Sequence, residues 1–284
     1  MDNPQKEELL NKFRDKLLYV NYSTNTVMTY IRYVNLFLTW CPIELENLTP
    51  VHITEFMGTL ADYSASSKNN ILKSYLPAFF KFSTNVGILK VNPLTLMKIP
   101  TAKSAHKEME ILSGDEMKKM VENPAGRGSQ VFRNKVLLKL LASTGIRISE
   151  ALSLCKKDIK DNKILIHGKG AKERMVNITT TTYKILQEYL RGIDVADDKS
   201  IFDLSRQWAM QVVIETAKIN EIDKKVTPHT FRHSFATFFC ANGGNESTLK
   251  KIMGWNRNFP THIYVDLANV DVSKEVLKIT EKME

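Results

Sequence analysis

Apolar side chains recur every three to four positions through the first hundred residues, which is the period of a helix with one buried face. The pattern predicts a helix from Gln5 to about Tyr19 and a second helix that begins after Ser23 or Thr24. A third helix is predicted from Thr49, because threonine is a good N-cap and the proline after it suits the first helical turn. The apolar residues that mark these helices are Leu9, Leu10, Phe13, Leu17, Leu18, Val27, Tyr30, Ile31, Val34, Leu36, Phe37, Leu38, Phe56 and Leu60.

A fourth helix is predicted from Ser66 or Ser67 to about Gly87, and it contains Pro77. Proline cannot donate a backbone hydrogen bond, so we expect a kink at that point. No alternation of apolar and polar residues appears between these segments. Residues 1–100 are therefore expected to form a small four-helix bundle.

The segment between Lys98 and Met109 loses the helical period and gains small and basic residues. This composition is typical of a linker. We therefore expect two domains, at residues 1–100 and 111–284, joined by residues 101–110. The length of 284 residues fits such a division.

The second domain opens with a capping box, in which Ser113 is followed three residues later by Glu116. A run of apolar residues then predicts a buried helix that stops at Gly145. The next residues, GIRISEAL, place Arg147 at the start of a short helix and Glu150 three residues further on. Taken alone, these two residues would also be explained by a local ion pair.

Residues 162–178, NKILIHGKGAKERMVNI, alternate between apolar and polar side chains on both sides of a Gly-Lys-Gly sequence. Alternation around a glycine turn predicts a β-hairpin, so the second domain is expected to be mixed α/β and the whole chain mainly α. Lys169, at the tip between the glycines, can reach outward without obstruction. Lys172 is the competing lysine for any role at this tip.

A helix is predicted from the Thr227–Pro228 pair to the glycines at 243 and 244. His229 and Arg232, three residues apart, share one face at its positively polarised end, which favours a bound phosphate. A second short helix from about Asn245 ends at Gly254, directly before Trp255, and Tyr264 follows nine residues later. The His229-x-x-x-His233 spacing also occurs in zinc sites, but the glutamate of a zinc-protease motif is missing.

These motifs, TGIRISE, GKGAKER, PHTFRHSFAT, MGW and IY, resemble in order and spacing the signature of the tyrosine recombinases, the phage-integrase and Xer-type family. The resemblance implies a two-domain DNA clamp with a four-helix core-binding domain and a mixed α/β catalytic domain. It is specific in the second domain and general in the first. The functional residues that it implies are Arg147, Glu150, Lys169, His229, Arg232, Trp255 and Tyr264.

By this resemblance Tyr264 attacks a DNA phosphate and leaves a 3′-phosphotyrosine, and a 5′-hydroxyl later reverses the step. The two arginines and Trp255, which stands where many relatives have histidine, are expected to hold the phosphate oxygens. His229 is the expected base, Lys169 the expected acid, and Glu150 is expected to orient the imidazole or the lysine. One phosphoester replaces another, so no cofactor, metal or ATP is expected.

The charge of the chain favours an anionic partner, although a basic balance alone is a weak indication of nucleic acid. The formal net charge is +9 and the isoelectric point about 9.3, with most of the excess in residues 101–284. Three scattered cysteines, the absence of a long apolar run and a polar amino terminus predict a cytoplasmic protein without disulfides or a membrane span. Double-stranded DNA is the expected partner.

The last residues place Val272, Val276 and Ile279 on one side of a short terminal helix. In the family this tail links protomers into a tetramer on DNA, and packing on its own domain is the alternative. The role that we expect is Xer-type resolution of chromosome or plasmid dimers, with an integrase of a mobile element as the alternative. A non-catalytic DNA-binding protein and a type IB topoisomerase are the rivals from other classes.

Overall fold

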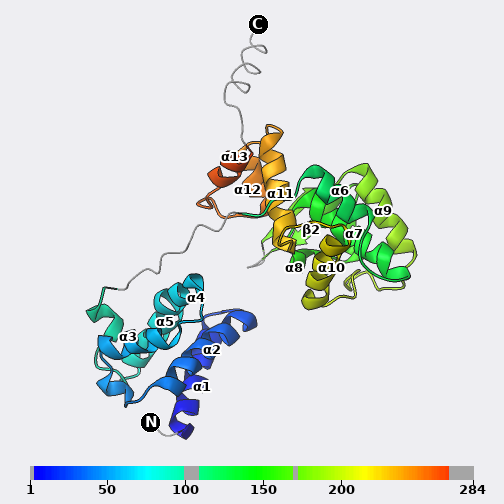
Figure 1. The fold of residues 1–284 in the computed structure, drawn as a ribbon. Helices are drawn as coiled ribbons and strands as arrows, with labels where there is room; N and C mark the ends of the chain where they lie inside the picture. The colour runs from blue at the N-terminus through cyan, green and yellow to red at the C-terminus, as the bar shows by residue number, and fades with distance from the viewer. Residues whose placement is uncertain (1–2, 99–108, 169–171, 269–284) are drawn as a thin grey trace. The chain divides into compact units, whose positions relative to one another are not determined.

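The computed structural model describes residues 3–98, 109–168 and 172–268, and the chain divides into two compact units, residues 1–107 and 108–284 (Figure 1). The predicted tail at Val272 to Ile279, linker residues 101–108 and Lys169 lie outside the described residues. No helix in the described part combines the length and the apolar character that a membrane crossing needs.

The N-terminal unit is built from helices around one apolar core. Its elements are α1 (Asn3–Tyr19), α2 (Thr24–Trp40), η1 (Leu45–Asn47), α3 (Pro50–Thr59), α4 (Ala65–Asn70), η2 (Ile71–Tyr75), α5 (Leu76–Asn85) and η3 (Pro93–Leu96). Ser23 and Ser64 cap α2 and α4 through their side chains, which fixes where both helices begin. Phe13, Phe37 and Phe79 are fully buried, so the predicted apolar faces do form the core.

The fourth predicted helix differs from the expectation at Pro77. Instead of one kinked α-helix, α4 passes through the π-helical turn η2 before α5 begins. The N–H of Leu76 bonds the carbonyl of Ile71, five residues back, so the turn widens just before the proline. A π-turn is a known way for a helix to absorb a break in its hydrogen-bond ladder.

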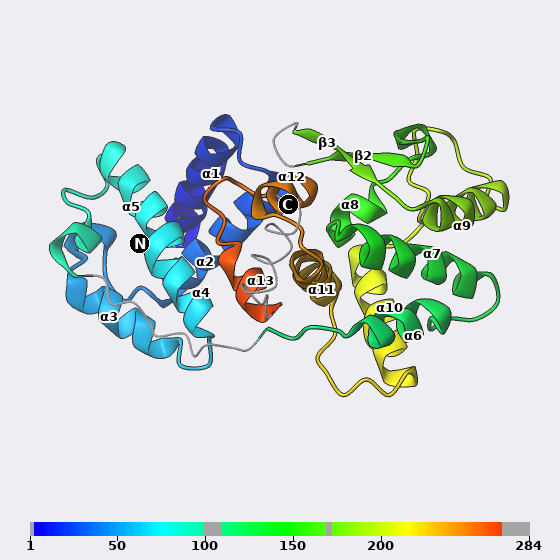
Figure 2. The same cartoon turned by 90° about the horizontal axis from the view of Figure 1, so that it is seen from above.

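The C-terminal unit is built around α7, a buried helix that contacts α6, α8, α9 and α11. Its helices are α6 (Gly114–Glu122), α7 (Ser129–Thr144), α8 (Ile148–Leu152), η4 (Lys156–Asp158), α9 (Thr180–Arg191), α10 (Arg206–Ile219), α11 (Pro228–Ala241), α12 (Glu246–Met253) and α13 (His262–Leu267). Figures 1 and 2 show α11, α12 and α13 next to one another at one end of this unit. Helices α9 and α10 had not been predicted, although an apolar stripe through Leu186 and Tyr189 marks α9.

The predicted hairpin is confirmed as β2 (Lys163–His167) and β3 (Glu173–Asn177), paired antiparallel with Ile164 opposite Val176. The short strand β1 (Ile159–Lys160) adds a third strand in the order β1-β2-β3. Ile164, Ile166 and Val176 point into the core, as the alternation required.

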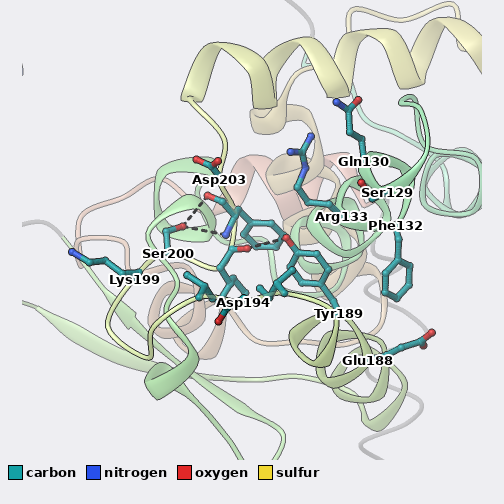
Figure 3. A pocket seen from close by; sticks show the side chains of 15 residues that line it. Ser129, Gln130, Phe132, Arg133, Glu188, Tyr189, Asp194, Lys199, Ser200 and Asp203 are labelled. Atoms are coloured by element: carbon teal, nitrogen blue, oxygen red, sulfur yellow. Dashed lines mark hydrogen bonds between the residues drawn. The ribbon is translucent and has the colours of Figure 1, made fainter.

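A hollow of about 830 Å³ lies at the amino end of α7, between Arg133, Tyr189 and the loop that carries Ser200 (Figure 3). The Tyr189 hydroxyl donates to the Ile201 carbonyl at 2.9 Å, which joins α9 to this loop. None of the predicted functional residues in the described part of the chain lines it. The 16 residues of α7 separate it by roughly 24 Å from Gly145, at the other end of the helix.

Candidate active site

Helix α11 begins where the sequence predicts. The Thr227 side chain accepts the N–H of Thr230 at 3.3 Å, and Pro228 occupies the first helical position. His229 is then exposed near the first turn, whereas Arg232 has only 3% of its surface exposed. The amino end of α11 therefore presents one imidazole to solvent and holds one guanidinium inside.

Arg232 connects the ends of two other helices. Its Nη1 donates to the Gly145 carbonyl at 2.7 Å, and its Nη2 donates to the Met253 carbonyl at 2.6 Å. Both carbonyls lie at helix carboxyl ends, where a cation is favoured. Gly145 has a φ of +61°, and a Cβ there would lie 2.5 Å from the Phe235 ring. Only glycine fits at position 145, because its backbone has a positive φ and lies against the Phe235 ring.

Arg147 and Glu150 lie at the start of α8, directly after that glycine. The Arg147 N–H donates to Glu150 Oε2 at 2.8 Å and its Nη1 to Oε1 at 2.9 Å. The Glu150 side chain is 6% exposed and the Arg147 side chain 37%. The local pair considered from the sequence is present, but it belongs to a larger network.

Arg174, from β3, completes this network and was missed in the sequence. Its Nη1 and Nη2 donate to Glu150 Oε1 and Oε2 at 3.0 and 2.8 Å, and its Nε donates to the Ile252 carbonyl at 2.7 Å. The expectation was that Glu150 orients an imidazole or a lysine. In the structure its carboxylate instead accepts from two arginines, because β3 folds back against α12. The only signal in the sequence was the arginine of GKGAKER.

Tyr264, on α13, is fully buried at the centre of a small core with Leu249 and Met253. Its ring stacks on Trp255 with centroids 5.2 Å apart, and the Arg232 guanidinium lies 5.2 Å from the Trp255 ring. The structure thus brings together Arg232 from α11, Tyr264 from α13 and Trp255 from the loop between α12 and α13. Thr261, at the start of α13, donates a hydrogen bond to Glu246 of α12, which attaches the tyrosine helix to its neighbour.

The Tyr264 hydroxyl contacts His233 and not His229. Its oxygen lies 2.8 Å from His233 Nδ1, and the two rings stack with centroids 5.8 Å apart. In the sequence His233 stands out only for its zinc-like spacing from His229. Its position directly after Arg232 on the same helix was the signal that would have found it.

Burial shifts the pKa values at this site. It raises the pKa of Tyr264 to about 12 and is the main cause that lowers the pKa of Arg232 to about 9 and that of His233 to about 4. Burial alone would raise the pKa of Glu150, but hydrogen bonds from the two arginines outweigh it and lower that pKa. At neutral pH the tyrosine and His233 are therefore uncharged, while Arg232 is a cation.

A hollow of about 920 Å³ opens beside these groups and is lined by cations from α8, the hairpin and α12. The lining includes Arg147, Arg174, Lys172, Lys250, Lys251 and Trp255. At its rim, His167 Nε2 lies 3.0 Å from a carboxylate oxygen of Asp158 and its Nδ1 2.9 Å from one of Glu173, which connects η4 to both strands of the hairpin. A hollow with several cations and few acids suits an extended anion.

The sequence matches the profile of the phage integrase family over residues 110–270, and residues 9–83 match the phage integrase N-terminal SAM-like domain. This chain belongs to the phage integrase family. Tyr264 and every predicted site residue lie within the matched part of the C-terminal unit. The integrase fold accordingly accounts for both described units.

Curated members of the integrase family are similar over nearly their whole length. The tyrosine recombinase XerD of Chlorobaculum tepidum is 29% identical, with 93% of this chain and 94% of that protein covered. The tyrosine recombinase XerC of Thermodesulfovibrio yellowstonii is 27% identical, with 92% and 90% covered. The crystal structure of the XerH recombinase bound to its difH substrate has the same fold, with a TM-score of 0.76, 22% identity, and 92% of this chain and 81% of that chain covered.

Proposed function

We propose that this protein is a site-specific tyrosine recombinase of the Xer type, which cuts and rejoins double-stranded DNA through a covalent bond to Tyr264. The observation that carries the proposal is the packing of Tyr264 against Trp255, whose ring also contacts the guanidinium of Arg232. A phenol beside permanent cations is the arrangement that a phosphoryl transfer without a metal requires.

The reaction follows from these groups. The Tyr264 oxygen attacks the phosphorus and the phenolic proton leaves, while the bond from phosphorus to the 5′ oxygen breaks and that oxygen gains a proton. Arg147 and Arg232 bind the non-bridging oxygens through guanidinium N–H groups that are not used in the hydrogen bonds described above. Trp255 donates its indole N–H to the same oxygens, and its ring forms one side of the site. A 5′-hydroxyl of a second strand reverses the step, so no ATP is consumed.

We assign the proton for the 5′ oxygen to Lys169, which lies outside the described residues. Lys172 is the alternative, and it is exposed beside the same cationic hollow. We assign the acceptance of the phenolic proton to the imidazoles of α11, of which His229 is open to the solvent. Because the Tyr264 side chain is fully buried, the groups that cover it must shift before a phosphate reaches the phenol.

The N-terminal unit offers DNA two segments without acidic residues. Its carboxylates all lie in residues 1–15 and 44–62, so α2 and the segment from Ser64 to Lys98 carry only cations. Tyrosine rings in and beside these segments contact in series, with centroid distances of 4.9 to 6.4 Å. The series is Tyr22, Tyr30, Tyr75, Tyr33 and Tyr63. Phenol hydroxyls and cations together suit the phosphates of a duplex.

We infer that four copies assemble on DNA, joined through the tail after Ala268, and that the protein acts on the chromosome in the cytoplasm. Resolution of chromosome or plasmid dimers is the role that we favour, because the two curated relatives described above bear Xer names. Integration of a mobile element uses the same chemistry. Recombination between two copies of a chromosomal site on one plasmid, measured in cells, distinguishes the two roles.

The test of the chemistry is the covalent complex. A binding site is first selected from random duplexes, and a nick beside the cut position then lets the short 5′-hydroxyl strand diffuse away. The protein should form a DNA adduct that resists detergent, and Tyr264→Phe should bind the site but form none. Tyr183→Phe, on α9, is the matched control and should behave as the original protein. Binding without an adduct would show a non-catalytic DNA-binding protein, and relaxation of plasmids without strand exchange would show a topoisomerase.

A further inference from the structure

The hydroxyl of Tyr264 is the reacting atom of the proposed function, and within the described residues its hydrogen-bond partner is His233. The distance from Oη to Nδ1 is 2.8 Å, and the rings lie within 24° of parallel. The contact joins α13 to α11 across the small core in which the tyrosine is buried. A group that touches the reacting oxygen is placed to handle its proton.

The arrangement of α11 continues this contact toward the surface. His229 and His233 are four residues apart, so both project from one side of the helix, and their rings lie 6.4 Å apart. Tyr264 is buried, His233 is half-buried and His229 is exposed. The three groups thus run from the core to the solvent. The spacing that resembles a zinc site in the sequence places two imidazoles in line with the phenol instead.

The charge state of His233 suits a base. Burial and the facing His229 and Arg232 of its own helix lower its pKa, and the group that faces it from α13 is the neutral phenol. The imidazole is therefore unprotonated near neutral pH, and its Nδ1 can accept the phenolic hydrogen. A phosphate bound to Arg232 would offset the nearest cation, so the basicity of His233 would rise when the substrate enters.

We propose that His233 is a further catalytic residue, whose Nδ1 takes the proton of the Tyr264 hydroxyl as the oxygen bonds to the DNA phosphorus. This inference rests on the proposed recombinase function. The phenolic O–H bond breaks, the O–P bond forms, and the positive charge on His233 is balanced by the phosphate beside Arg232. His229, the exposed member of these three side chains, then connects His233 to the solvent.

The test compares His233→Asn with the original protein in single-turnover formation of the covalent adduct on the nicked duplex. Asparagine retains an acceptor in this position but does not take up a proton near neutral pH. We expect adduct formation to slow by about 100-fold or more, the usual contribution of a general base. The original protein should reach a plateau as pH rises through the pKa of the imidazole. The rate of the variant should keep rising with hydroxide.

Two further variants separate chemistry from folding. His233→Gln should show the same loss and the same changed pH profile. Thr237→Val removes a buried hydroxyl without a hydrogen-bond partner, one turn along α11, and should react as the original protein does. DNA affinity and the thermal midpoint are measured for each variant.

Adduct formation by both His233 variants within threefold of the original rate, with the same pH profile, would overturn the assignment. A faster reaction of the variants would also overturn it, because the hydrogen bond would then only restrain the tyrosine. Failure of the original protein to form any adduct would instead refute the proposed function, and the inference with it. A loss that appears equally in Thr237→Val would assign the effect to the packing of α11 and reject the catalytic role.

Discussion

Replacing Glu150 by glutamine tests whether one buried carboxylate holds the arginines of the site. Each of its two oxygens accepts two hydrogen bonds, one from Arg147 and one from Arg174. In Glu150→Gln one oxygen becomes an NH2 group that faces two donors, so two of these bonds are lost. Arg174, whose side chain is 13% exposed, also loses its counter-charge.

The magnitude follows from burial. Removing one partner of a buried ion pair costs about 3–5 kcal/mol, but Arg147 is 37% exposed and water screens its share. We therefore expect the free energy of unfolding to fall by about 3 kcal/mol, mainly through Arg174. Adduct formation should slow by at least about tenfold, because Arg147 loses one of the two hydrogen bonds, from its backbone N–H and from Nη1, that hold it to the carboxylate.

The assay is urea unfolding followed by tryptophan fluorescence in a Trp40→Phe background. The two remaining tryptophans, Trp208 and Trp255, then report on the C-terminal unit only. Glu116→Gln is the matched control, because Glu116 bonds Lys224 at 2.6 Å in a more exposed ion pair at the start of α6. We expect the free energy of unfolding of the control to fall by about 1 kcal/mol and its activity to stay unchanged. Equal losses in the two variants, or full activity of Glu150→Gln, would refute the reasoning.

Two further predictions concern pH and salt. The pKa of His233 falls from about 6.5 to about 4 on folding, so between pH 6.5 and pH 4 the folded state binds fewer protons than the unfolded state. The free energy of unfolding should therefore fall by up to about 3 kcal/mol as the pH drops from 6.5 to 4. Urea unfolding at pH 7 and 4.5 measures this loss, and His233→Asn should show less of it; an unchanged loss would contradict the shift. Replacing Arg32 and Lys68 by alanine should reduce the salt slope of DNA affinity by about 2, one for each cation. Lys12→Ala, on α1, whose lysine pairs with Glu8 at 2.6 Å, should leave the slope unchanged, and equal slopes for all variants would remove Arg32 and Lys68 from the interface.

The sequence alone determined the local structure, because caps, turns and alternation act between residues close in the chain. The capping box of Ser113 and Glu116 is present with bonds of 2.6 and 3.1 Å, and Thr227 starts α11 as predicted. The hairpin follows from Ile164 and Val176 facing one side. The order of the motifs likewise indicated the family before any contact was known.

Only the tertiary structure decided which side chains meet. Arg174 reaches Glu150 from another strand, and the Tyr264 hydroxyl meets His233 because α13 packs on α11. Such contacts join residues far apart in the chain, and they depend on how helix faces and core volumes fit together. The spacing of residues within one segment does not predict how those faces and volumes fit. For the same reason burial, which raises the pKa of Tyr264 and lowers that of His233, follows from the packing and not from either residue's neighbours in sequence.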